Sequence, residues 1–464
     1  MKVIRDAVLG DIEVEPGLLE LLDTSEVQRL RGVKQLGTAS LVYPSAVHTR
    51  FEHSLGTLQL ARRILERLEA RAGGPVLSGR EREATLASAL LHDVTHIPFG
   101  HTLEDERRLF DRHDTPERML RFLRQGELAR VLDRRGLRDS VEATLAAVPT
   151  AGPVGIMAEI VRGTVGADLL DYLGRDAYFC GFRTTFDERI FRYFVLESGR
   201  LALAVVKDGL LRTDALSEVL NLLWLRYALC ERVYYHHAKV AAGAAISKAV
   251  EIALDRGLEV AELYPLRDEG LFEHLRARFG RSRRLRTLLA RIEARRLYKR
   301  AYVLTPVIGA AREEELVRRY HFDREARKQA ESELARAIRV GSEDVIVYCP
   351  AAHMALKEAD MPLLVGPRAK ARTVPSVSRG PPGAAPAAPD SGVVRLSDLG
   401  LPEVEVLRAK HRDLWRFYVF LAPERRERAS SLSRACEELF RERNLLDVVG
   451  RGPLRLCLEA REGA

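Results

Sequence analysis

Hydrophobic residues recur every three to four positions over most of the first 350 residues, and charged residues occupy many of the positions between them. This period is typical of amphipathic helices that bury one face. It predicts a mainly α protein, and it is clearest in residues 58–70, 84–91, 216–252 and 271–296.

Two segments depart from the helical period. Residues 194–212 alternate around Leu203 and Val205 and include the turn Lys207-Asp208-Gly209, which predicts a β-hairpin between helices. Residues 344–350 form a short apolar run and predict a buried strand.

The composition changes late in the chain. Residues 362–392 are rich in Pro, Gly, Ala and Ser, so they predict a linker or long loop. We therefore expect a large helical domain over residues 1–350 and a small α+β unit over residues 393–464. This unit is predicted to contain a strand at 414–421 and a helix at 425–444, and its expected role is packing or regulation.

The overall composition is that of a soluble globular protein, with 464 residues, 46% hydrophobic and 30% charged. No apolar run reaches the length of a membrane span, and the first residues lack the apolar stretch of a signal peptide. We expect a cytoplasmic protein with no membrane partner. The cysteines are far apart and form no Cys-x-x-Cys pair, so we expect them to be reduced and buried: Cys180, Cys230, Cys349, Cys436 and Cys457.

A formal net charge of +8 favours polyanionic partners. Arginines gather in residues 276–286, where a nucleic-acid-binding surface is one interpretation. Phe279 is the one aromatic residue in that run, and grooves for single-stranded nucleic acid interleave several aromatic residues with basic ones. A solvated helix face is therefore favoured, with nucleic-acid binding as the alternative.

Ionisable residues with metal-binding chemistry interrupt the apolar segments. His53, His92, Asp93 and Asp168 supply two imidazoles and two carboxylates, a donor set that holds a divalent metal able to activate water on a phosphate. His92 and Asp93 directly follow the predicted helix at 84–91. Neighbours on a helix point about 100° apart, so both side chains can reach one metal.

Further histidines follow within ten positions of this pair. His96 is expected one helical turn on, over the same face, and His101 in a turn because Pro98 and Gly100 break the helix. One histidine alone is usually an ordinary core residue, but burying the whole group is costly unless a cation or an anionic ligand compensates it. The acidic residues of segment 168–176 lie at helical spacing, so on their own they also fit a solvated face.

Short sequence words surround these residues in a fixed order. They are Lys34-Gln35-Leu36-Gly37, His48-Thr49-Arg50-Phe51-Glu52-His53-Ser54-Leu55-Gly56, His92-Asp93, Pro98-Phe99-Gly100-His101 and Asp171-Tyr172-Leu173-Gly174-Arg175-Asp176, followed by Arg226 and Tyr234-Tyr235-His236. Over roughly the first 350 residues they resemble the HD-domain superfamily, and within it the deoxynucleoside triphosphate triphosphohydrolases that include the mammalian SAM-and-HD-domain enzyme and its bacterial relatives.

The resemblance implies a helical HD-domain core around a metal held by His53, His92, Asp93 and Asp168. The metal would be a divalent transition metal, such as Mn, Fe, Zn, Co or Ni, with additional Mg allowed. It also implies that water attacks the α-phosphate of a deoxynucleoside triphosphate, which releases the deoxynucleoside and triphosphate.

The resemblance also implies roles around the substrate. His96 and His101 would contact the phosphates, Glu104 would orient His101, His113 would protonate the departing oxygen, and Arg50 would neutralise phosphate charge. A homo-oligomer (tetramer or hexamer) and a nucleotide activator are expected as well. The residues that would contact the sugar, its 3′-hydroxyl and the phosphates are Gln35, Leu36, Tyr172, Asp176, Arg226 and Tyr234.

The chain departs from the family pattern where it would hold a triphosphate. Leu169 stands where a basic residue usually follows the fourth metal ligand, and His237 stands where a phosphate-binding lysine is usual. Thr95 and Ile97 replace glycines after His92-Asp93. Fewer permanent positive charges weaken the grip on a triphosphate, so removal of a terminal phosphate, or action on a shorter nucleotide, stays an alternative.

Other functions fit the sequence less well. A guanosine-tetraphosphate hydrolase is disfavoured because Val94-Thr95-His96 replaces the paired acidic residues that usually follow His-Asp in that group. Cyclic-nucleotide phosphodiesterases of the superfamily are disfavoured by the same local words. A non-catalytic nucleotide-sensing protein is the alternative from another class, although the chain has all four candidate metal ligands.

Overall fold

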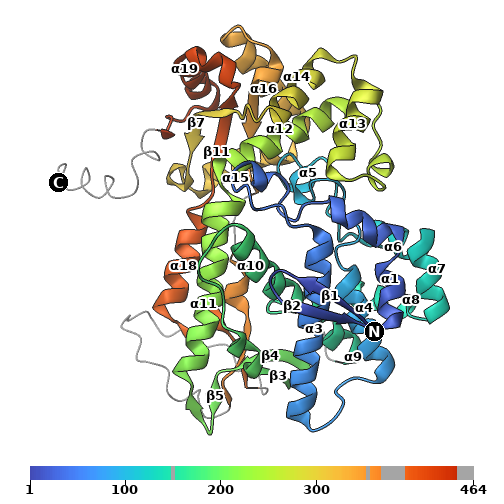
Figure 1. Cartoon of the computed structure of the whole chain (residues 1–464). Helices are drawn as coiled ribbons and strands as arrows, with labels where there is room; N and C mark the ends of the chain where they lie inside the picture. Colours follow the sequence, from blue (N-terminus) through green and yellow to red (C-terminus); the bar gives the residue numbers. More distant parts are fainter. Residues whose placement is uncertain (148–151, 352–355, 367–391, 447–464) are drawn as a thin grey trace, which may run out of the picture.

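Helices make up most of the protein, so the prediction of a mainly α fold is confirmed (Figure 1). The computed structural model describes residues 1–147, 152–351, 356–366 and 392–446. In the view of Figure 1 the molecule has a lower half, built mainly from the first 229 residues, and an upper half, built mainly from the residues that follow.

The lower half is a group of helices around α3, against which α4 and α10 pack. A capping box of Thr49 and Glu52 starts α3, and Gly73 ends it with a left-handed backbone conformation. The helices of the first 229 residues are α1 (Pro16–Leu22), α2 (Ser25–Gln28), α3 (Arg50–Ala72), α4 (Gly79–Leu91), α5 (His101–Asp105), α6 (Pro116–Arg124), α7 (Gly126–Arg135), α8 (Arg138–Ala146), α9 (Pro153–Arg162), α10 (Ala167–Phe179) and α11 (Thr213–Leu229). Single 3-10 turns lie between them: η1 (Arg29–Gly32), η2 (Gly37–Leu41) and η3 (Glu188–Tyr193).

Short antiparallel strand pairs lie on the lower half. The first two strands, β1 (Lys2–Asp6) and β2 (Gly10–Val14), pair with each other. The predicted hairpin at 194–212 is in fact two successive hairpins: β3 (Phe194–Glu197) with β4 (Arg200–Ala204), and β5 (Val206–Lys207) with β6 (Leu210–Leu211). The predicted turn at Asp208-Gly209 closes the second of these, where both residues have positive φ, as a type I′ turn requires.

The upper half surrounds the alanine-rich helix α12 (His237–Leu254), which packs closely on α14 and η2 because its side chains are small. Its other helices are α13 (Asp268–Phe279), α14 (Arg283–Glu293), α15 (Ala310–Leu316), α16 (Arg324–Ala337) and α19 (Ala429–Phe440). Shorter turns are η4 (Cys230–Tyr234), η5 (Val260–Leu263), η6 (Pro306–Ile308), η7 (Val317–Phe322), η8 (Ser342–Asp344) and η11 (Pro423–Arg428). Its sheet has the order β7 (Lys299–Leu304), β11 (Phe417–Leu421), β8 (Val345–Tyr348).

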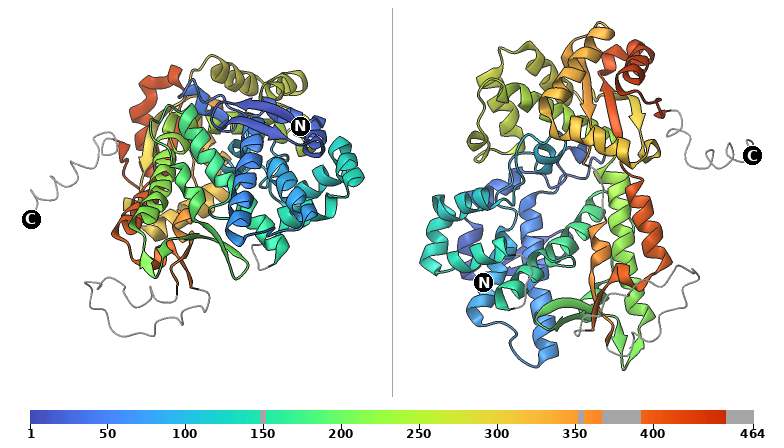
Figure 2. Two further views of the ribbon diagram at one scale, coloured as in Figure 1. Left: turned by 60° about the horizontal axis from the view of Figure 1, so that its bottom comes forward. Right: turned by 180° about the vertical axis from the view of Figure 1, so that it is seen from behind.

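The residues after position 392 join elements formed by earlier parts of the chain. Strand β11, near the predicted 414–421, is the middle strand of the upper sheet, and β10 (Val393–Arg395) extends a lower sheet of order β10-β9-β4-β3. Helix α18 (Pro402–Arg412) lies alongside α11, as Figure 2 shows from behind. The predicted α+β segment therefore has no sheet of its own among its described residues, and η10 (Leu396–Leu399) links its first strand to α18.

Several predicted boundaries need correction. The start of the predicted linker is strand β9 (Pro362–Leu364), preceded by η9 (Lys357–Asp360), while residues 367–391 lie outside the described residues. The helical run 216–252 is broken at the π-helical turn η4, and the run 271–296 is broken after Gly280. The predicted strand at 344–350 is β8, and the predicted helix at 425–444 shortens to α19.

Other surface and side-chain predictions can be compared directly. Within the described ranges no helix combines the length and the apolar character needed to cross a bilayer. Cys180, Cys230, Cys349 and Cys436 are buried free thiols, and Cys457 lies outside the described residues. In the arginine run, Arg276 and Arg278 form ion pairs with acidic neighbours, which is typical of a solvated helix face.

Candidate active site

The four residues predicted as metal ligands converge between α3, α4 and α10. His53 Nε2 lies 3.1 Å from His92 Nε2 and 3.1 Å from Asp168 Oδ1. Asp93 Oδ2 lies 3.7 Å from His53 Nε2, and Asp93 Oδ1 lies 3.7 Å from His92 Nε2. The structure thus brings all four side chains to one point from positions up to 115 residues apart.

Each ligand has a defined place on its element. His53 lies in the first turn of α3 and Asp168 in the first turn of α10. Helix α4 ends at Leu91, so His92 is its C-terminal cap and Asp93 begins the following loop. The expectation that His96 continues this helix is wrong, because the helix stops before His92 and His96 lies in the loop.

The two imidazoles present bare nitrogens to the same point. His53 Nδ1 lies 2.8 Å from Asp171 Oδ2, and His92 Nδ1 lies 2.8 Å from the backbone oxygen of Ala89. Each Nδ1–H therefore donates outward, which leaves the Nε2 lone pairs facing each other beside two carboxylates. Lone pairs and carboxylates packed together in a buried site require a cation, so this donor set fits a divalent metal.

The electrostatics of His53 agree with this fit. Burial alone lowers its pKa, but hydrogen bonds with Asp168 and Asp171 raise the pKa of His53 to about 10. Without a metal, this imidazole would hold a proton between the carboxylates. A bound metal ion replaces that proton as the compensating charge.

A buried chain of charges fixes the orientation of His53. Arg175 donates to both oxygens of Asp171, at 2.8 and 2.9 Å, and also to Asp6 Oδ2 at 2.8 Å. A Cβ atom at Gly56 would lie 1.8 Å from Asp171 Oδ1, so a glycine is required where this carboxylate crosses α3. Helical spacing alone left a solvated face open for Asp171, and the structure buries it. No sequence signal pointed to Asp6, which joins the site only through folding.

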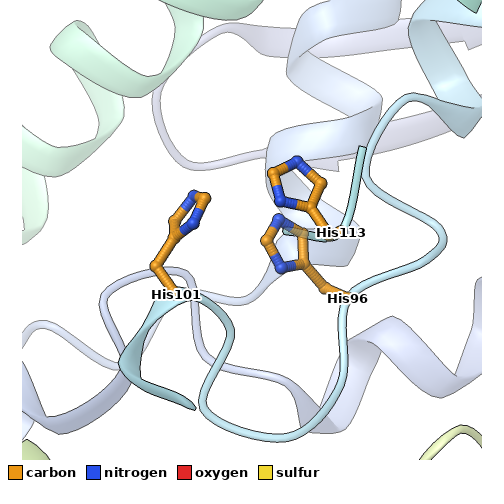
Figure 3. Close-up of side chains that lie close together, drawn as sticks. All are labelled: His96, His101 and His113. Carbon is orange, nitrogen blue, oxygen red and sulfur yellow. The ribbon is translucent and has the colours of Figure 1, made fainter. Parts of the chain in front are cut away.

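Three further histidines form a second cluster next to the ligands (Figure 3). The rings of His96 and His113 stack at 3.7 Å between centroids, and His101 faces them edge-on at 4.8 and 5.0 Å. Glu104 Oε2 accepts hydrogen bonds from His101 Nδ1 at 3.1 Å and from His113 Nδ1 at 3.3 Å. Glu104, predicted to orient His101, therefore orients His113 as well.

Glu104 is itself held in place by Arg118, whose Nη1 lies 3.0 Å from Glu104 Oε1. Burial raises the pKa of Glu104, but the hydrogen bonds from His101 and His113 outweigh it and hold the pKa well below its usual range. The carboxylate therefore stays ionised at neutral pH. No sequence pattern had singled out Arg118, which lies on α6.

The inner histidines of this cluster are neutral at pH 7. Burial lowers the pKa of His96 well below its usual value, with Arg50 adding to the shift, and burial also lowers the pKa of His113. His96 Nε2 lies 3.2 Å from Asp93 Oδ1, while the buried Nδ1 of His96 has no hydrogen-bond partner among the described residues. An unsatisfied buried imidazole nitrogen beside a metal-type donor set fits a ligand that carries phosphate oxygens.

Arg50 lies directly behind the ligands. It is buried, and its Nη1 donates to Asp93 Oδ2. Gly100 allows this placement, because a Cβ atom there would lie 2.5 Å from Arg50 Nη2. The guanidinium charge therefore balances Asp93 in the absence of any ligand. This pairing reduces the positive charge that Arg50 has available for a ligand.

Two of the residues predicted to contact the substrate, Asp176 and Tyr234, are hydrogen-bonded to each other. Asp176 Oδ2 accepts from Tyr234 Oη at 2.6 Å, and Asp176 Oδ1 lies 2.8 Å from His48 Nε2. His48 belongs to a matching sequence word but had no predicted role. Gln35 Oε1 is buried and lacks a hydrogen-bond partner among the described residues, so it is available to a ligand hydroxyl. Leu36 is half-buried and packs against the main core.

Two side chains mark where the site meets solvent. The exposed fraction is 33% for Asp168 and 42% for His101, whereas it is 1% for His53 and 7% for Asp93. The site is therefore open to solvent on the side of Asp168 and His101.

Comparison with known proteins agrees with this geometry. The family model described as the HD domain matches residues 50–149, and the model described as the HD associated region matches residues 202–379. The first match includes three of the four candidate ligands. Asp168 falls between the two matched ranges.

Similar proteins come from archaea, animals and bacteria. An uncharacterised protein of Methanocaldococcus jannaschii is 34% identical over 308 residues, which cover 64% of this chain and 59% of that protein. The deoxynucleoside triphosphate triphosphohydrolase SAMHD1 of Bos taurus is 26% identical over 398 residues, covering 75% and 66%. The crystal structure of a phosphohydrolase from Bacteroides thetaiotaomicron has a TM-score of 0.64 at 21% identity, covering 91% of this chain and all of that one, and so shares its fold.

Proposed function

We propose that this chain, which carries an HD domain and resembles the deoxynucleoside triphosphate triphosphohydrolases, is a metal-dependent phosphohydrolase that acts on deoxynucleoside triphosphates. Because the chain spans about three fifths of the Methanocaldococcus protein, its activity is inferred from its own site. The observation that carries the proposal is the convergence of His53, His92, Asp93 and Asp168 next to three histidines.

The proposed reaction is attack of water on the α-phosphate, with release of the deoxynucleoside and inorganic triphosphate. Bound to the four side chains, a divalent metal supplies Lewis-acid polarisation of a phosphate oxygen and lowers the pKa of a bound water. His96 and His101 contact the phosphates from the open side of the site. Arg50 is already paired with Asp93, so only part of its positive charge is available to the bound phosphate.

Proton transfer falls to the cluster around Glu104. Glu104 stays ionised and accepts from the Nδ1–H of His113, so the Nε2 of His113 faces the site. A phosphate anion close to His113 favours its protonated form, and the imidazolium then donates the proton to the departing 5′-oxygen of the nucleoside. Asp176, Tyr172, Tyr234, Gln35 and Leu36 surround the sugar in this scheme.

A product analysis tests the proposal. We expect purified protein with Mn²⁺ or Mg²⁺ to convert each deoxynucleoside triphosphate into deoxynucleoside and triphosphate, and we expect EDTA to stop the reaction until metal is restored. The double variant His92→Ala with Asp93→Ala should lose activity while its circular dichroism spectrum stays unchanged. Intact substrates with metal-loaded, folded protein would contradict the substrate assignment.

A second candidate function is removal of terminal phosphates from nucleotides by the same metal chemistry. It is favoured by Leu169 and His237, which stand where the family usually has basic residues. Orthophosphate as the first product, in place of triphosphate, would establish this alternative. A nucleotide activator and a homo-oligomer are proposals from the resemblance. Light scattering measures the oligomeric state, and the hydrolysis rate with and without a second nucleotide measures activation.

A further inference from the structure

Arg226 is expected to contact the substrate phosphates, and its surroundings are unusual for that task. Its guanidinium lies between two aromatic rings, 5.3 Å from the ring centre of Tyr172 and 5.2 Å from that of Tyr234. The ring of Tyr172 lies 6.5 Å from the ring of His53, so Arg226 is close to the candidate metal ligands. The guanidinium is thus held beside the reacting centre.

A carboxylate occupies the position next to this guanidinium. Glu358 Oε1 lies 3.0 Å from Arg226 Nε and 3.5 Å from Tyr172 Oη. Glu358 is in the turn η9, more than a hundred residues from Arg226 along the chain, and it is buried. A buried carboxylate repels phosphate, so its presence among phosphate-binding residues needs a reason.

The ion pair does not satisfy every hydrogen-bond donor of Arg226. The Nε atom is buried and makes no hydrogen bond with any residue that the structure describes, although the carboxylate lies within ion-pair distance. Glu358 therefore cancels the charge of Arg226 without satisfying its N–H group. Such a guanidinium can still donate a charge-assisted hydrogen bond to a phosphate oxygen once the carboxylate of Glu358 moves away.

Three positions near the site contribute no unpaired positive charge. Arg50 is paired with Asp93, and Leu169 carries no charge. Burial, together with Arg300, lowers the pKa of His237 to about 4, so this side chain is neutral at pH 7. These three positions therefore offer little positive charge to the distal phosphates of a triphosphate.

We propose that Glu358 competes with the distal phosphates of the substrate for Arg226 and so determines how well the site accepts a long phosphate chain. The inference rests on the proposed function and names a specificity-determining residue for it. A nucleotide with one phosphate binds with the Arg226–Glu358 pair intact. A triphosphate gains Arg226 only by displacing Glu358, which raises the KM for triphosphates selectively.

The test is steady-state kinetics of the variant Glu358→Gln with a deoxynucleoside triphosphate and with the matching monophosphate. The amide has the size of the carboxylate but no charge. We expect the KM for the triphosphate to fall about tenfold or more, the size of one charge-assisted hydrogen bond, with kcat nearly unchanged. The KM for the monophosphate should stay the same.

Asp360→Asn is the matched control, because it removes the same charge from the same turn. Asp360 is exposed and accepts a hydrogen bond from Ser397 Oγ at 2.8 Å, away from Arg226. It should leave both KM values unchanged. If Glu358→Gln changes the KM of both substrates alike, or leaves the triphosphate KM unaltered, Glu358 is not a competitor for phosphate. Glu358→Asp keeps the charge, so it should retain the wild-type ratio of the triphosphate KM to the monophosphate KM. This variant is measured if the glutamine variant does not fold.

A binding measurement separates this inference from the proposed function. The probe is a deoxynucleoside triphosphate analogue in which a methylene group replaces the 5′-oxygen, so it lacks the Pα–O5′ bond that the proposed reaction breaks. If no nucleotide is hydrolysed by any variant, the proposed function fails, yet tighter binding of the probe by Glu358→Gln still supports competition. Equal binding by wild type and variant overturns the competition whatever the hydrolysis shows.

Discussion

At the residue scale, the orientation of His53 decides whether the site can hold a metal. Its Nδ1 atom is bonded to Asp171, which in turn is held by Arg175. A carboxylate in this place fixes the tautomer of the imidazole and increases its basicity toward the metal. Asp171 is therefore a positioning residue, although its side chain is not among the four candidate ligands.

We predict that Asp171→Asn lowers metal affinity by about 10- to 100-fold, which is the usual cost of losing such a partner. Metal content after dialysis, measured by elemental analysis, checks the prediction, and activity should recover at high metal concentration. Asp208→Asn is a suitable control, because it removes a carboxylate from an exposed turn where asparagine accepts the positive φ. Full metal retention by the Asp171 variant would show that Arg175 and Asp6 do not act through His53.

The sequence predicted the candidate metal ligands more completely than the residues that hold them in place. The donor types of His53, His92, Asp93 and Asp168 are visible in any sequence, and the structure brings them together. Arg118 and Asp6 gave no such signal, because ordinary charged residues acquire a function only through neighbours that the fold supplies. The burial of Asp171 was left open, since helical spacing alone does not show which face is covered.

At the scale of elements, a buried charge network joins the end of α5 to α12, α16 and β8. Glu331 Oε1 accepts from Arg107 Nη1 at 2.6 Å and from the backbone amide of Val347 at 2.9 Å, and Glu331 Oε2 accepts from Lys248 Nζ at 2.8 Å. Burial raises the pKa of Glu331, but Arg107 and Lys248 outweigh it and lower the pKa to about 2. The segment that follows α5 is thereby held against the upper half of the molecule.

We predict that Glu331→Gln lowers the free energy of unfolding by about 3 to 5 kcal/mol at pH 7, because it leaves buried cations without their partner. The pKa of Glu331 is lower in the folded state than the ordinary 4.5, so its stabilisation is complete above pH 4.5 and is lost as the pH falls toward 2. The difference between wild type and variant in urea unfolding should therefore shrink over that range. A difference that stays constant down to pH 2 would contradict the assignment.

At the scale of elements, hydrophobic periodicity predicted some helices and missed several boundaries. The helical period over residues 58–70 identified α3 because a repeated apolar face is a local feature, but it did not show that the helix begins at Arg50. The break between α11 and α12 was missed, because hydrophobic residues continue through the π-helical turn η4. The hairpin of β3 and β4 was merged with its neighbour, since Ser198-Gly199 is a weaker turn signal than Asp208-Gly209.

At the scale of the whole molecule, strand β11 joins distant parts of the chain. Its residues pair with β7 on one side and β8 on the other, so the strand closes the upper sheet. Sequence analysis placed it in a separate unit, because a composition change looks like a boundary whether or not the chain returns to an earlier sheet. Pairing across such separations leaves no local trace.

We predict that a chain ending at residue 392 does not form a stable upper half, because both β7 and β8 lose their hydrogen-bonded neighbour. Limited proteolysis should cut it between residues 299 and 348, and thermal unfolding should lose cooperativity. A chain ending at residue 446 keeps every described strand and serves as the comparison. Equal protease resistance of the two chains would show that residues 393–446 are dispensable for the fold.

The position of β11 also has a consequence for biosynthesis. As the polypeptide leaves the ribosome, all four candidate ligands have been made by residue 168, whereas the central strand of the upper sheet arrives some 250 residues later, tens of seconds at ordinary rates of translation. Metal can therefore be captured by a nascent chain whose remaining half is still unfinished. Maturation of the protein then ends with the insertion of one late strand between two early ones.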